Sequence, residues 1–157
     1  MRHHHNMRRN LFGGLIAAAM LLSGTQAMAA FNAGARAGFS SDPDQFVIGG
    51  QAVIGSVAPF IQLAPSLDLG FGNDISVTAL NIDLQYNFPS LPKVSPNIYV
   101  GAGPSIVIAD SDTEVGVSLV AGLRIPMAGI SYYNFETRFG LDNVPDLKVL
   151  LGIMFGL

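Results

Sequence analysis

The residues best suited to chemistry are charged side chains that alternate with other residues near the end of the chain. Glu136 and Arg138 are two positions apart, and so are Asp146 and Lys148. Residues two apart in an extended strand point to the same face, so each pair brings opposite charges together. Such charges can form a salt-bridged network, line the constriction of a pore, or act as a catalytic acid–base dyad. We favour the salt-bridged network and keep the other two as alternatives.

The same alternation collects a larger set of charges on one face of the predicted strands. Every other charged side chain after the first 29 residues falls in a predicted connection between strands, so the opposite face carries no charge. Buried charges must be paired or hydrated, and we therefore expect a polar network. Its predicted members are Arg36, Asp68, Asp83, Glu114, Arg124, Glu136, Arg138, Asp146 and Lys148.

The residues on the charged face include no histidine, the usual general base for a serine nucleophile. Ser105 and Ser118 share the charged face, and a serine nucleophile is activated by a neighbouring base, most often histidine. The chain has three histidines, all within its first five residues, ahead of a predicted cleavage site. We therefore expect a protein that is not an enzyme, with both serines packed in its interior.

No residue pattern predicts a metal or another cofactor. The run from Asp110 to Glu114 is acidic, but it lacks the glycine and the spaced bidentate glutamate of a calcium-binding loop. We interpret it as a solvated loop, with weak divalent binding as the alternative. The chain has no cysteine, which excludes disulfide bonds and thiolate metal sites.

Two prolines fall in the middle of predicted strands, on the uncharged face. Proline lacks the N–H that a central strand donates to its neighbour. Pro65 and Pro104 therefore mark either a bulge or a strand predicted too long, which is the interpretation we favour, or a lateral gap through which a lipid or acyl chain could pass.

These residues lie on strands that alternate strictly between two kinds of side chain. From Leu80 to Phe88 every second residue is large and apolar, and the residues between them are Asn81, Asp83, Gln85 and Asn87. The polar set cannot fill an apolar core. The pattern therefore indicates an inverted barrel with an apolar outside and a polar inside, which is typical of a transmembrane β-barrel.

Turn residues divide the chain into eight such segments, each near the length that a tilted membrane strand needs. Most glycines take the inward parity, as the crowded interior of a small barrel requires. We predict an all-β, eight-stranded, up-and-down antiparallel transmembrane barrel. Its strands are expected over Phe31–Phe39, Phe46–Gly55, Phe60–Gly72, Val77–Phe88, Asn97–Ile108, Glu114–Ile125, Ile130–Gly140 and Asp146–Leu157.

The first 29 residues predict a cleavable signal peptide. Arginines precede the apolar stretch from Leu11 to Leu22, and Ala27-Met28-Ala29 is a typical cleavage site. We therefore expect residues 1–29 to be the signal peptide and residues 30–157 to be the barrel. Without the leader's three arginines, five Lys and Arg remain against eleven Asp and Glu, a net charge of −6. That balance excludes nucleic-acid binding.

In its signal peptide, strand alternation and last strand, the chain resembles the small outer-membrane β-barrel superfamily of Gram-negative bacteria, of the OmpA/OmpX and opacity-protein type. Its end matches the terminal motif of that class at Gly152, Phe155 and Leu157, although Leu150 replaces a polar residue and Leu157 replaces the usual phenylalanine. The resemblance implies a location in the outer membrane and contact with its lipid and lipopolysaccharide. It also implies recognition of the last strand by the barrel-insertion machinery, and a monomer.

The predicted function is non-enzymatic, with a structural or surface-interaction role and a polar lumen closed by its own side chains. The predicted connections are short, whereas recognition usually depends on extended loops. One alternative is a narrow channel, or a conduit for a lipid or other hydrophobe across or into the outer membrane. Another is a soluble lipocalin-like carrier, which would need the apolar parity inside and the charges outside.

Overall fold

A computed structural model describes residues 31–72, 75–89, 96–142, 144–145 and 147–157 of the chain. The predicted signal peptide, residues 1–29, lies outside the described residues, and so does Asp146 of the predicted network. The predicted barrel domain begins at residue 30, and the first described residue, Phe31, is also the first residue of a strand.

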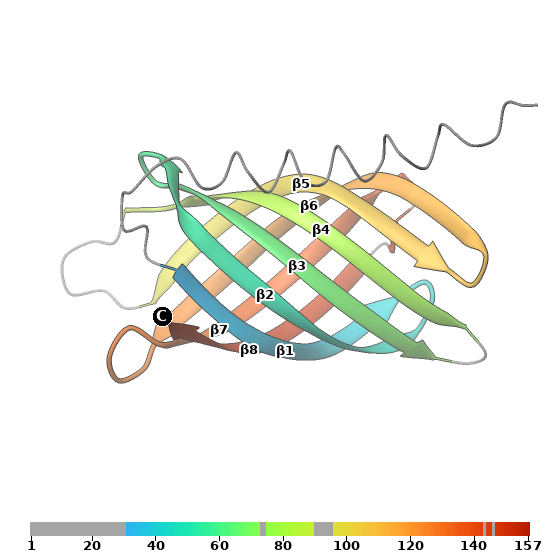
Figure 1. Ribbon diagram of the computed structural model, residues 1–157, viewed down its shortest axis with the longest axis horizontal. Coiled ribbons are helices and arrows are strands. Elements are labelled where there is room, and N and C mark those ends of the chain that lie inside the picture. The colour runs from blue at the N-terminus through green and yellow to red at the C-terminus, as the bar shows by residue number, and fades with distance from the viewer. Residues whose placement is uncertain (1–30, 73–74, 90–95, 143, 146) are drawn as a thin grey trace, which may run out of the picture.

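Eight antiparallel strands close into a barrel in which β1 pairs with β8 (Figure 1). The order around the barrel follows the chain, which confirms the predicted up-and-down topology. The described residues include no helix long and apolar enough to cross a membrane. The strands are β1 (Phe31–Ser41), β2 (Gln45–Ala58), β3 (Ile61–Gly72), β4 (Ser76–Asn87), β5 (Asn97–Ala109), β6 (Asp112–Pro126), β7 (Tyr132–Leu141) and β8 (Leu147–Gly156).

The two ends of the barrel differ in charge. We call acidic the end with the turns that follow β1, β3, β5 and β7, because Asp42, Asp44, Asp110 and Asp142 lie there. We call the other end terminal, because β1 begins and β8 ends there. Asp42, Asp110 and Asp142 have positive φ angles of 46°, 49° and 65°, a conformation that aspartate tolerates better than most residues.

The strands β1, β2, β5 and β6 are longer than predicted, whereas β3, β7 and β8 are shorter. Asp112 and Thr113 were expected in a turn but belong to β6, so only Asp110 and Ser111 separate β5 from β6. The segment Ser56–Ala58 was also expected in a connection, but it extends β2 through two register shifts against β3. β7 begins at Tyr132, two residues later than predicted. These differences lie at strand ends, where each connection is shorter or longer than its turn residues suggest.

Side chains alternate between the lipid-facing surface and the interior as predicted. On β4, Ile82 and Leu84 are 45% and 51% exposed, whereas Asn81 and Asp83 are 1% and 0% exposed. The charged side chains of the described strands are either buried inside or, like Glu114, lie at the acidic end. This arrangement contradicts the soluble-carrier alternative, which needs the opposite faces.

Two glycines let β1 approach β8 closely. A Cβ atom on Gly34 would contact the carbonyl oxygen of Ile153, and one on Gly38 would contact the carbonyl oxygen of Val149, both too closely for real atoms. These neighbours are backbone atoms held in the strand ladder, so they cannot rotate away. The seam that closes the barrel therefore requires residues without side chains on β1.

We expect Gly38→Ala to lower the free energy of unfolding by about 1–3 kcal/mol, the usual cost of overpacking. Gly50→Ala is the matched control, because a Cβ there would have only the carbonyl oxygen of Gly34 as a neighbour, at 3.7 Å. Urea titration of both variants in lipid vesicles measures the difference. Equal stabilities would show that the seam adjusts to a side chain.

Candidate functional site

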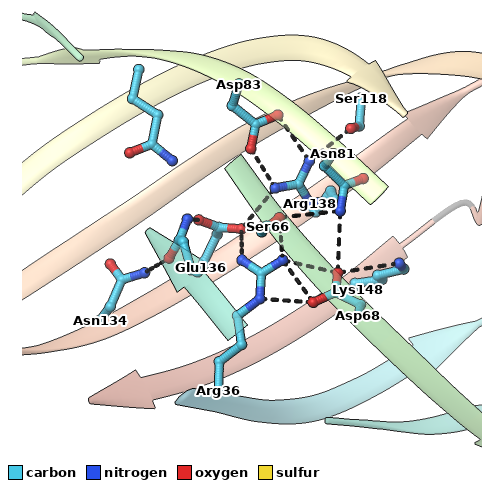
Figure 2. A network of polar contacts seen from close by, with 12 residues as sticks. Arg36, Ser66, Asp68, Asn81, Asp83, Ser118, Asn134, Glu136, Arg138 and Lys148 are labelled. Carbon is cyan, nitrogen blue, oxygen red and sulfur yellow. Dashed lines mark hydrogen bonds and ion pairs between the residues drawn. The ribbon is translucent and has the colours of Figure 1, made fainter. Parts of the chain in front are cut away.

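Glu136 on β7 lies at the centre of a buried polar network in the lumen (Figure 2). Its carboxylate accepts hydrogen bonds from Arg36 Nη1 at 3.0 Å and Arg138 Nη2 at 3.1 Å. It also accepts from Tyr99 Oη at 2.7 Å and Gln51 Nε2 at 3.2 Å. These donors come from strands around the barrel, so this carboxylate joins side chains from several walls.

Arg138 connects Glu136 to a second carboxylate. Its two terminal nitrogens donate to the two oxygens of Asp83 on β4, at 3.0 and 2.5 Å. One of them also donates to Ser118 Oγ at 2.8 Å. A guanidinium that binds both oxygens of a carboxylate forms one of the stronger charged contacts in proteins. The predicted pairing of Glu136 with Arg138 is present, and Asp83 is an additional partner.

Arg36 forms the equivalent two-pronged contact on the opposite wall. Its Nε and Nη2 donate to the two oxygens of Asp68 at 2.8 and 2.9 Å, and Nη2 also donates to Ser66 Oγ at 2.8 Å. Lys148 Nζ lies 3.6 Å from Asp68 Oδ2. Asp68 lies on β3, and Asp146, the predicted partner of Lys148, lies outside the described residues.

This network contains three positive and three negative residues, so its net charge is zero: Arg36, Arg138 and Lys148 against Asp68, Asp83 and Glu136. All six side chains are 5% exposed or less. We call these six residues the lumen network. A neutral and paired set avoids the large free-energy cost of an isolated buried charge.

Two predicted members lie apart from the lumen network. Glu114 has the expected parity on β6, opposite the buried Val107, but its side chain is exposed at the acidic end. The expectation that it belongs to the interior is therefore wrong: its side chain is exposed, and the buried residues at that end, such as Val107, are apolar. Arg124 lies inside the barrel, towards the terminal end.

Arg124 is held by neutral groups instead of carboxylates. Its Nη1 donates to Gln62 Oε1 at 2.9 Å and to Asn87 Oδ1, and its Nη2 donates to Gln85 Oε1. Its guanidinium carbon lies 4.2 Å from the centre of the Tyr99 ring, a cation–π contact. Because Tyr99 also donates to Glu136, it links Arg124 to the lumen network.

Apolar side chains cover the lumen network at both ends of the barrel. Towards the acidic end, Val144 from the connection after β7 packs against Val77, Ala79 and Val107. Towards the terminal end, Val53, Ala64 and Met154 form a second cluster, against which Tyr132 packs. The interior is thus layered, with the charged groups between two apolar layers. A cavity beside Arg138 and Lys148 measures only about 10 Å³, about the minimum that holds one water molecule.

Neutral polar residues complete the network, although none of them was among its predicted members. Asn81 Nδ2 donates to Ser66 Oγ at 3.2 Å, and Ser105 Oγ donates to Asn81 Oδ1 at 2.7 Å. The hydroxyls of Ser105 and Ser118 are 2.7 Å apart. Both serines are packed in the interior, as expected, and their partners include no histidine. The sequence feature that indicates these neutral residues as members of the network is their inward parity, which they share with the charged residues.

Both prolines lie within continuous strands, so neither strand was predicted too long. Pro65 pairs with Ile82 on β4, and Pro104 pairs with Val117 on β6. The bulges of β2 lie nearer its end, between Ile54 and Ala58. Each proline also faces a second neighbouring strand, β2 for Pro65 and β4 for Pro104. In the β2–β3 and β4–β5 ladders the residue pairs at the prolines are missing, but the register is the same before and after them. The lateral gap stays an untested prediction.

In the described part of the chain, no group of three or more His, Asp, Glu or Cys residues is arranged so that it could bind a metal ion. Paired guanidinium and carboxylate groups fix the distances between strands from opposite walls, and the apolar layers exclude water from these pairs.

Comparisons with known proteins identify the fold. No protein-family model matches the chain, and no curated protein is similar in sequence. Three solved structures of bacterial barrels are similar. The N-terminal β-barrel domain of Pseudomonas aeruginosa OprF has 18% identity and a TM-score of 0.65, over 82% of this chain and 98% of that one. Neisserial surface protein A (NspA) has 14% identity and a TM-score of 0.65, over 82% and 96%.

The attachment invasion locus protein of Yersinia pestis (Ail) has 14% identity and a TM-score of 0.51, over 81% of this chain and 97% of that one. A structure from the de novo design of transmembrane β-barrels has 16% identity and a TM-score of 0.61, over 84% and 98%. The chain therefore has the fold of a small transmembrane β-barrel. This fold confirms the predicted architecture and agrees with the expected location in the outer membrane.

Proposed function

We propose that this chain, which has the eight-stranded fold of small outer-membrane barrels of the OmpA/OmpX type, is a non-enzymatic structural protein of the outer membrane with a closed lumen. The observation that carries the proposal is the layered interior: a neutral, fully buried lumen network lies between two apolar layers. Side chains fill this interior, and the cavity beside Arg138 and Lys148 is only about 10 Å³, so water and ions have no open path there.

The short turns at the acidic end favour a structural role over adhesion. Only Asp42–Asp44 separate β1 from β2, and only Asp110 and Ser111 separate β5 from β6. A protein that binds a macromolecular partner usually presents longer loops. Surface interaction is therefore the weaker form of the same proposal.

The partners in this proposal are those of a barrel embedded in lipid. Outward residues of β8, such as Leu151 and Phe155, are 59% and 52% exposed and suit contact with acyl chains. The same strand is the segment that we propose the insertion machinery recognises. We propose a monomer, because β1 and β8 already pair with each other and leave no open sheet edge.

Planar-bilayer recording tests the closed lumen. We expect the purified protein to give no steady conductance, because an eight-stranded interior is only wide enough for its own side chains. Glu136→Ala combined with Arg138→Ala should produce small leak events, since it removes the centre of the lumen network while leaving equal numbers of positive and negative charges. Slower gel migration after boiling confirms that both proteins are folded.

Voltage-stable single-channel steps from the unmodified protein would contradict the closed lumen. They would favour the second candidate, a narrow channel whose constriction is the lumen network. The specific observation behind that candidate is the ring of charged side chains itself.

A further inference from the structure

A groove crosses the lipid-facing surface over β1. This strand lies between β8 and β2 (Figure 1). Its volume is about 690 Å³, within the range of small-molecule sites. Ala35, Ala37 and Gly50 form its floor, and larger apolar side chains from β2, β3 and β8 form its walls. We call it the β1 groove.

The sequence of β1 makes this groove. Its outward residues are small through the middle of the strand and aromatic at both ends, from Phe31 to Phe39. Strand pairing then sets the cross-section: Ala35 and Gly50 lie side by side, with Ile153 beyond one and Leu67 beyond the other. Across β8, β1, β2 and β3, two small residues therefore lie between two large ones.

The groove has the chemistry of a site for a hydrocarbon chain. Its walls are aliphatic, and it is continuous with the apolar surface that the barrel presents to the bilayer. A flexible acyl chain can follow the tilted floor and gain dispersion contacts on three sides, whereas on a convex part of the barrel it gains them on one side.

One polar group at the edge of the groove gives the lipid an orientation. Tyr133 lies near the start of β7, at the terminal end, and its side chain is 43% exposed. Tyrosine suits the boundary between acyl chains and polar headgroups, because its ring is apolar and its hydroxyl forms hydrogen bonds. A lipid whose ester groups lie at Tyr133 would extend its chain along the floor towards the acidic end.

A second copy of this chain fits the groove poorly. A two-fold symmetric dimer uses the same patch on both subunits, so two concave surfaces would face each other and enclose a void. Atoms that line a void lose their packing contacts.

From these observations we infer that the β1 groove binds one acyl chain of a glycerophospholipid in the leaflet on the terminal side. This lipid exchanges more slowly than other lipids around the barrel. Of the lumen network only Arg36 borders the groove, and its charged side chain is buried inside the barrel.

Native mass spectrometry after refolding into palmitoyl-oleoyl phosphatidylcholine vesicles and extraction into mild detergent tests the inference. We expect the unmodified protein to retain phosphatidylcholine, and Ala35→Leu combined with Ala37→Leu to retain one molecule fewer, because the leucines fill the floor. Thr78→Leu combined with Thr137→Leu is the matched control. It adds two leucines to the lipid-facing rows of β4 and β7, outside the groove.

Retention of no lipid by the unmodified protein, or equal retention by both double variants, would overturn the inference. Heat-dependent gel migration establishes that each variant is folded.

A second measurement works in the bilayer itself, because the chain has no tryptophan. Tyr133→Trp places a fluorophore at the groove, and Phe135→Trp places one two residues along the same strand, outside it. With brominated phosphatidylcholine as quencher, filling the groove with Ala35→Leu and Ala37→Leu should reduce the quenching of Tyr133→Trp and leave that of Phe135→Trp unchanged. An unchanged signal from Tyr133→Trp would count against a lipid in the groove.

Discussion

Arg138→Met is expected to destabilise the barrel by about 3–5 kcal/mol, the cost of breaking a buried ion pair by removing one partner. Arg138 is 2% exposed and contacts both Asp83 and Glu136. Without it, the lumen network has two positive charges, on Arg36 and Lys148, against three negative ones. The uncompensated carboxylate then lies between two apolar layers, where water cannot hydrate it.

The double variant Arg138→Met with Asp83→Leu is the decisive control. It leaves Arg36 and Lys148 against Asp68 and Glu136, so the network is neutral again. Replacement of a whole buried pair by apolar residues is often close to neutral, and we expect the double variant to be more stable than Arg138→Met alone. Urea titrations of both variants in lipid vesicles give the coupling between the two positions. If the two effects simply add, Arg138 and Asp83 do not act as a pair in the folded protein.

The sequence was sufficient to predict the architecture because one physical rule acts along every strand. Side chains alternate between lipid and interior, so a charge such as that on Asp83 or Glu136 fixes the parity of its whole strand. Turn residues then mark the number of strands. Strand ends were less predictable: Asp112 looks like a turn residue, yet it pairs with Ala109 in the β5–β6 ladder.

The partners inside the lumen required information that alternation does not contain. Glu136 and Arg138 are neighbours on one strand, so their contact was predictable. Arg36 and Asp68 are 32 residues apart, and Arg138 and Asp83 are 55 apart. Such contacts depend on the tilt and stagger of the strands, which every turn and bulge changes by whole residues.

The apolar layers were also missed, and for a related reason. Val144 lies in a connection, where the strand pattern makes no prediction, yet it is 7% exposed inside the acidic end. Met154 at the terminal end has the inward parity but an apolar side chain, and so have Val53 and Ala64 beside it. Parity shows which residues face inwards, whereas their height along the barrel decides which ones form a layer.

Ile82→Arg is expected to destabilise the protein by about 2–4 kcal/mol, the cost of an arginine on the lipid face of a barrel at the bilayer midplane. Ile82 lies at the middle of β4 and is 45% exposed. An arginine there must either remain in hydrocarbon or bend towards a distant interface, and its partner on β3 is Pro65, which offers no polar side chain.

An arginine substitution near the end of a strand is the control, because it shows whether the cost depends on depth in the bilayer or is the same wherever an arginine is introduced. Phe71 is the penultimate residue of β3, close to the acidic end, and is 48% exposed, almost as much as Ile82. Near the interface the cost of arginine falls to about 0–1 kcal/mol, so we expect Phe71→Arg to be tolerated far better, apart from the loss of aromatic contact area. The free energies of unfolding in lipid vesicles, measured by urea titration, provide the comparison. Equal costs at the two depths would mean that the outer surface does not cross a bilayer, because only a hydrocarbon layer makes the cost of a charge depend on its height along the barrel.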